Sequence, residues 1–132
     1  MKLFKKLFLG VSLAVLPFSV LAVPQTPPGG GSSSNVTHSG NSEISVDTTS
    51  DGASYASTTG SENALLVSGG NSTINNPTVT KSGDSSGDEA DFYGTNAAIF
   101  TYNNATLNIN GGSVTTNGSN ANGVFAYGTG TI

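Results

Sequence analysis

Four acidic side chains in the stretch DSSGDEAD are the residues best suited to chemistry. They are Asp84, Asp88, Glu89 and Asp91. Carboxylates combined with serine hydroxyls and backbone carbonyls on a glycine-containing loop can supply the oxygen ligands that calcium requires. Their spacing matches neither an EF-hand loop nor the glycine-rich nonapeptide that binds calcium in β-rolls. Besides a calcium site, we consider an exposed acidic insertion, whose charge would hinder edge-to-edge strand pairing.

Catalysis by these acids meets a geometric obstacle. Glycoside hydrolysis needs two carboxyl groups on opposite sides of the scissile bond. Here all four acids lie in one short loop, and no equivalent acids occur in the neighbouring repeat. A Ser-His-Asp arrangement is also disfavoured, because the single histidine, His38, precedes the region expected to fold. We therefore expect no catalytic residues.

Aromatic residues form a second set that could have a functional role. The runs AIFTY and VFAY place two pairs of rings at matching positions: Phe100 with Phe125, and Tyr102 with Tyr127. Alternate residues share one face of a strand, and neighbouring strands lie about 4.8 Å apart, so we expect one outward ladder of four rings. Such a ladder stabilises adjacent strands, or it offers a contact surface for sugar rings or a partner.

The elements that carry these rings repeat from Glu62 onward. Short runs such as AIFTY, TLNI and SVTT are separated by Asn and Gly, which tolerate sharp corners. Self-similarity in fixed register predicts a solenoid, here a right-handed parallel β-helix of about three coils. A β-sandwich is the alternative, but it does not explain the matching columns. We expect three inward columns: Leu66/Ile99/Val124, Ile74/Leu107/Ile132 and Val79/Val114, with Ile109 also inward.

The N-terminal part predicts export. Residues 1–22 have the basic start, apolar core and small-residue cleavage site of a signal peptide. Residues 23–42 form a Pro/Gly/Ser-rich linker, in which we expect His38 to be solvated. Residues 43–61 contain possible irregular N-cap strands, and the β-helix follows over 62–132. After cleavage Lys81 is the only basic side chain against eight acidic ones, which excludes nucleic-acid binding.

A family resemblance is carried by two stretches. SENALLVSGGNSTINNPTVTKSGDSSGDEADFYGTNAAIF and the later NGVFAYGTGTI, with the motifs N-[AG]-x-x-x and G-x-x-T-[IL], resemble the start of pectate-lyase-like right-handed β-helix surface proteins of bacteria. These are adhesins and autotransporter-passenger-like proteins. The resemblance implies a non-catalytic, secreted or cell-surface segment that serves as a stalk or binds carbohydrate or a host or cell-surface protein.

The same resemblance implies two further expectations. Proteins of this kind carry many more coils, so the chain looks like a truncated copy or a fragment whose exposed coil end self-associates. Lyases of this fold use a basic residue, usually arginine, and the chain has no arginine. The alternative function is therefore a remnant of a β-helix carbohydrate-active enzyme, hydrolase or lyase-like. We expect no cofactor other than calcium and no membrane span after signal cleavage.

Overall fold

The computed structural model describes residues 36–132, so the predicted signal peptide and residues 23–35 of the predicted linker lie outside the described part. This part is built from short strands and one short helix. The strands are β1 (Gly40–Ile44), β2 (Thr49–Asp51), β3 (Ser54–Ser57), β4 (Asn63–Val67), β5 (Asn71–Asn75), β6 (Thr78–Lys81), β7 (Ile99–Thr101), β8 (Thr106–Asn110), β9 (Ser113–Thr116) and β10 (Val124–Ala126). The helix is α1 (Asp88–Tyr93).

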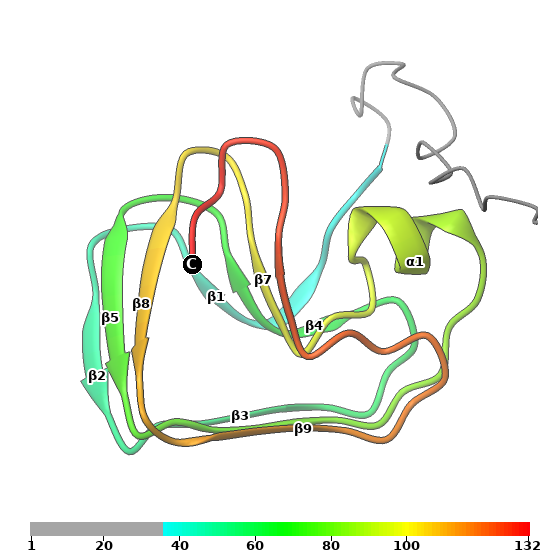
Figure 1. Cartoon of the computed structure of the whole chain (residues 1–132), viewed down its shortest axis with the longest axis horizontal. Coiled ribbons are helices and arrows are strands. Elements are labelled where there is room, and N and C mark those ends of the chain that lie inside the picture. Colours follow the sequence, from blue (N-terminus) through cyan, green and yellow to red (C-terminus); the bar gives the residue numbers. More distant parts are fainter. Residues whose placement is uncertain (1–35) are drawn as a thin grey trace, which may run out of the picture.

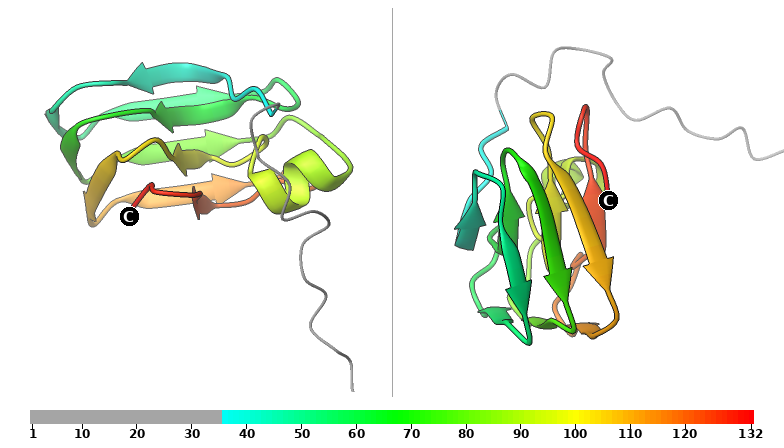
Figure 2. Two further views of the ribbon diagram at one scale, coloured as in Figure 1. Left: turned by 90° about the horizontal axis from the view of Figure 1, so that it is seen from above. Right: turned by 90° about the vertical axis from the view of Figure 1, so that its left-hand side faces the viewer.

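Successive strands visit three parallel sheets in turn. The sheet orders are β1-β4-β7-β10, β2-β5-β8 and β3-β6-β9, which we name sheets A, B and C. Three consecutive strands therefore make one circuit, and each circuit pairs with the one before it. The circuits lie behind one another in Figure 1 and stack as layers in Figure 2. This arrangement is consistent with a parallel β-helix-like solenoid, and the seven strand pairs between the described circuits are all parallel.

Asn and Gly make the corners of the circuits, as predicted. Asn103 and Asn104 between β7 and β8 have φ values of 55° and 61°, and Gly112 between β8 and β9 has a φ of 81°. A Cβ atom at Gly112 would lie 2.3 Å from the carbonyl oxygen of Pro77 on the preceding circuit. Glycine is therefore required at this corner both for the left-handed backbone and for the close approach of two circuits.

The hydrophobic core lies inside the circuits, between the three sheets. It contains Ile44, Ala64, Leu65, Val67, Ile74, Val79, Ala98, Ile99, Ala105 and Leu107, with Tyr55, Ile109 and Val114 packed against it. Sheets B and C contribute alternate residues, because successive side chains on a strand point to opposite faces. The inward positions of Val79 and Val114, which pair directly, are confirmed.

Two of the predicted columns need correction. Leu65, and not Leu66, pairs with Ile99, whereas the pairing of Ile99 with Val124 is as predicted. Leu66 points outward into a second apolar cluster. The error arose because β4 is a continuous apolar run that is buried on both faces, and alternation cannot assign the faces of such a run.

The second correction concerns sheet B. Ile74 pairs with Ile109, and Ser72 pairs with Leu107, so the predicted column of Ile74 with Leu107 is wrong by two residues. A shift of two residues leaves the same side chains on the inward face, so Ile74, Leu107 and Ile109 all remain inside as predicted. Val124 and Ile132 were also predicted to point inward. They lie on the circuit that begins with the edge strand β10, and they are 43% and 44% exposed.

The region 43–61, for which irregular cap strands were expected, contains most of a regular circuit. Its strands β1, β2 and β3 pair in parallel with β4, β5 and β6. The circuit begins at Gly40, inside the predicted linker. Several of its inward positions are occupied by serine (Ser42, Ser50 and Ser57), and only Ile44 and Tyr55 are large apolar side chains on the inner face. This low apolar content concealed the circuit in the sequence.

The acidic insertion folds into the helix α1, which lies outside the stacked strands (Figure 1). Gly87 precedes the helix, and Gly94 ends it in the left-handed conformation. Asp88, Glu89 and Asp91 occupy its first turn, where negative charge favours the helix dipole. Ala90 is its buried residue, and the carbonyl of Ala90 accepts a hydrogen bond from the Asn122 side chain at 3.0 Å.

Candidate functional site

The outer face of sheet A carries an aromatic cluster. Phe100 on β7 and Phe125 on β10 are paired residues, and their rings stack with centroids 5.9 Å apart at 24°. Gly94 at the end of α1 approaches both rings so closely that an added Cβ would lie 2.8 Å from each. The predicted Phe100–Phe125 stack therefore exists, but the prediction that Phe100 is exposed is wrong, since it is 0% exposed.

His38 covers the other side of Phe100. Its imidazole stacks on the Phe100 ring at 4.0 Å and 18°, and its centroid lies 5.3 Å from that of Tyr102. The expectation of a solvated histidine is thus wrong, because residues 36–39 run along the aromatic cluster to β1, and the carbonyl of Ser39 accepts a hydrogen bond from the Asn63 amide. The only sequence signal for this packing is the alternation of Val36 and His38 with polar residues, within a Gly/Ser-rich stretch.

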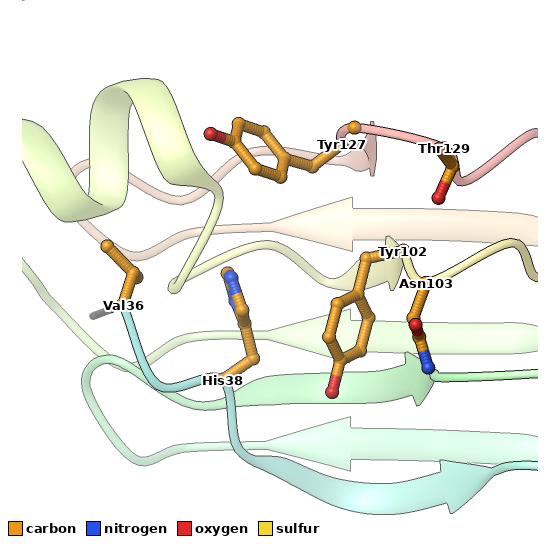
Figure 3. Close-up of a pocket in the computed structure, with 7 residues that line it drawn as sticks. Val36, His38, Tyr102, Asn103, Tyr127 and Thr129 are labelled. Carbon is orange, nitrogen blue, oxygen red and sulfur yellow. The ribbon is translucent and has the colours of Figure 1, made fainter. Parts of the chain in front are cut away.

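The two tyrosines of the predicted ladder separate from one another. Tyr102 leans toward Phe100, with centroids 5.5 Å apart, and Tyr127 packs edge-on against Tyr93 of α1 at 5.6 Å. Figure 3 shows their hydroxyl ends pointing away from each other, with His38 beside Tyr102. Tyr102 and Tyr127, which lie on adjacent circuits, therefore do not stack and leave a space between them.

That room is a pocket of about 270 Å³. Its walls combine aromatic rings with polar groups from neighbouring circuits and from the segment before β1 (Figure 3). The lining residues are Val36, His38, Tyr102, Asn103, Tyr127, Gly128 and Thr129. Two of the four predicted ligand-contact residues, Tyr102 and Tyr127, thus line the pocket, while Phe100 and Phe125 pack beneath and beside them.

Several hydrogen-bonding groups remain for a ligand in this pocket. Thr129 accepts a bond from the backbone N–H of Asn104 at 2.9 Å and keeps its hydroxyl proton to donate. Asn103 donates to the carbonyl of Ser68 at 3.1 Å and is otherwise exposed. The Nδ1 atom of His38 is buried with no partner among the described residues. Burial lowers the pKa of His38, so its imidazole is neutral at pH 7.

The predicted calcium ligands do not come together. Asp84 accepts a hydrogen bond from the Ser119 amide at 2.7 Å, and Asp91 accepts one from the Asn120 side chain at 2.5 Å. Within residues 36–132 no group of three or more His, Asp or Glu side chains is placed to hold a metal ion.

Two buried polar side chains at the corners escaped the sequence analysis. Lys81 is 0% exposed and donates to the carbonyls of Thr59 at 2.7 Å and Gly83 at 3.1 Å. Burial lowers its pKa, and the charges of Glu62 and Asp84 partly oppose this shift. Alternation along β6 could have revealed it, because Lys81 lies two residues after the inward Val79. The second side chain is Asn96, which bonds to three separate corners.

Comparisons with known proteins add no assignment. No protein-family model, no curated protein and no solved structure matches the chain. In the described part, none of the helices has the length and apolar character needed to cross a membrane.

Proposed function

We propose that the chain is a non-catalytic segment of a secreted or cell-surface, adhesin-like right-handed parallel β-helix that binds carbohydrate between Tyr102 and Tyr127. The observation that carries the proposal is the separation of these two rings on neighbouring circuits, which opens a pocket of about 270 Å³. Aromatic side chains next to hydroxyl and amide groups suit a sugar, because its ring has apolar C–H faces and a polar edge.

The scaffold supports this function. Tyr102 follows β7 and Tyr127 follows β10, and these strands are hydrogen-bonded neighbours. The Phe100–Phe125 stack beneath them is packed against Gly94 and His38, so the base of the site is held on several sides. A preformed aromatic surface loses little conformational entropy when a ligand binds.

The pocket itself favours binding over catalysis. None of its seven lining residues is acidic. Hydrolysis of a glycosidic bond ordinarily requires two carboxyl groups beside the scissile bond. Of the acidic residues singled out in the sequence, Asp84 and Asp91 accept hydrogen bonds from Ser119 and Asn120. These contacts give the acidic residues a role in holding the insertion against the last circuits.

A binding experiment tests the proposal. The chain from Val23 onward is applied to an array of glycans, together with a variant that carries Tyr102→Ser and Tyr127→Ser. The parent is expected to bind at least one class of glycan and the double variant to lose that binding, while both keep the same β-sheet circular dichroism. Phe92→Ser is the matched control, since Phe92 is 36% exposed on α1 and does not line the pocket. Equal binding by the double variant would refute the assignment.

A further inference from the structure

The walls of the pocket carry no formal charge at neutral pH. Its polar groups are two phenol hydroxyls, an amide, a threonine hydroxyl and the imidazole of His38. His38 stacks on Phe100 and is half-buried, and this burial favours the neutral imidazole. All of these groups can hydrogen-bond a sugar hydroxyl, but none is a cation that could pair with a carboxylate or a sulfate.

The part of the chain that the structure describes has a net negative charge. Residues 36–132 contain eight carboxylates and a single lysine: Glu43, Asp47, Asp51, Glu62, Asp84, Asp88, Glu89, Asp91 and Lys81. Lys81 is fully buried and bonded to two backbone carbonyls, so its charge cannot reach a ligand in the pocket. The helix α1, which carries three of the acids, packs its Tyr93 against the pocket residue Tyr127 at 5.6 Å.

From this charge distribution we infer that the pocket accepts neutral sugars and rejects the corresponding anionic sugars, such as uronic acids. The inference rests on the proposed carbohydrate binding at Tyr102 and Tyr127. A carboxylate that enters the pocket loses part of its hydration, finds no cationic partner, and meets a negative potential from the rest of the described chain. A hydroxymethyl group at the same position of the sugar ring incurs neither of these costs.

The size of the pocket defines the binding unit. A volume of about 270 Å³ lies just below the range usual for drug-sized ligands. It therefore suits a single sugar ring, either free or as one residue of a longer glycan. The specificity is accordingly expected to depend on the charge of that one residue rather than on the average charge of a polymer.

The experiment compares sugars that differ only at C6, where a neutral hydroxymethyl group is replaced by a carboxylate. The chain from Val23 onward is coupled to a surface, and the binding of methyl glycosides to it is measured at pH 7. The pairs are glucose and glucuronate, galactose and galacturonate, and mannose and mannuronate. In every pair that binds, the neutral member is expected to bind about tenfold tighter or more, because the anion leaves a charged group without a partner. Part of this difference should remain at physiological salt, since desolvation is not screened as distant charges are.

A variant tests the physical cause. Thr129→Lys places a cation at the exposed rim of the pocket, and Thr129→Met is its uncharged control of similar length. Both variants lose the Thr129 hydroxyl that accepts the Asn104 N–H, so the difference between them isolates the charge. The preference for the neutral sugar should be smaller in the lysine variant than in the methionine variant. If the acid of a pair binds as well as the neutral sugar and the Tyr102/Tyr127 double variant abolishes both, the inference is wrong and the proposed function stands. If no glycan in these pairs or on the array binds, both fail.

Discussion

The substitution Asn96→Ala tests how the stacked circuits are held together. Asn96 is 0% exposed. Its side-chain oxygen accepts a hydrogen bond from the Ser61 amide at 3.0 Å, and its nitrogen donates to the carbonyls of Gly83 at 2.9 Å and Ser119 at 3.2 Å. Ser61, Gly83 and Ser119 lie at the corners that follow the first, second and third circuits. One side chain thus connects three layers of the structure.

The expected loss of stability follows from these three bonds. A typical hydrogen bond contributes about 0.5–1.5 kcal/mol net, and a buried backbone group left without a partner costs about 1–3 kcal/mol. Alanine should therefore lower the free energy of unfolding by about 3 kcal/mol, a large part of the roughly 5–15 kcal/mol of a typical domain. For a domain of this size the melting temperature should fall by about 10–20 °C.

The assay is urea and thermal unfolding followed by circular dichroism on the chain from Val23 onward. Asn108→Ala is the matched control, because Asn108 is exposed and its one hydrogen bond, to the Ser72 carbonyl, is long at 3.4 Å. The control should change the free energy of unfolding by less than about 0.5 kcal/mol. If Asn96→Ala and Asn108→Ala unfold at the same urea concentration, the buried amide does not hold the circuits together.

Two further predictions concern the aromatic cluster. Gly94→Ala should lower the free energy of unfolding by about 2–4 kcal/mol, because its Cβ would lie 2.8 Å from the Phe100 and Phe125 rings at a φ of 68°. Gly52→Ala, at a φ of 64° with no atom within 4 Å, should cost only about 1 kcal/mol in urea unfolding, and equal losses would contradict the packing argument. Burial lowers the pKa of His38, so the parent should lose stability relative to His38→Phe as the pH falls below about 6.5, while their difference stays constant above it. Parallel stability curves of parent and variant from pH 8 to pH 5 would show that His38 does not stay neutral in the folded chain.

The candidate site was predictable only in part. The recurrence of AIFTY and VFAY placed Phe100 next to Phe125 and Tyr102 on the circuit next to Tyr127, because the step between these circuits has no insertion. It could not reveal which rings remain accessible. That depends on α1 and on residues 36–39, which pack against the cluster from distant parts of the chain. The third aromatic wall, His38, could not be found from local pattern alone.

The sequence by itself determined the parallel strands, the Asn and Gly corners and the inward position of Val79 and Val114. The parallel strands follow from self-similarity in fixed register. The corners and the inward positions follow from the left-handed backbone that few residues tolerate and from alternation, which act within a few residues of the chain. Only the tertiary structure decided the register of Leu65 and the burial of Phe100. Both depend on which segment covers the outer face of sheet A. A strand such as β4, which is buried on both faces, carries no local signal of that choice.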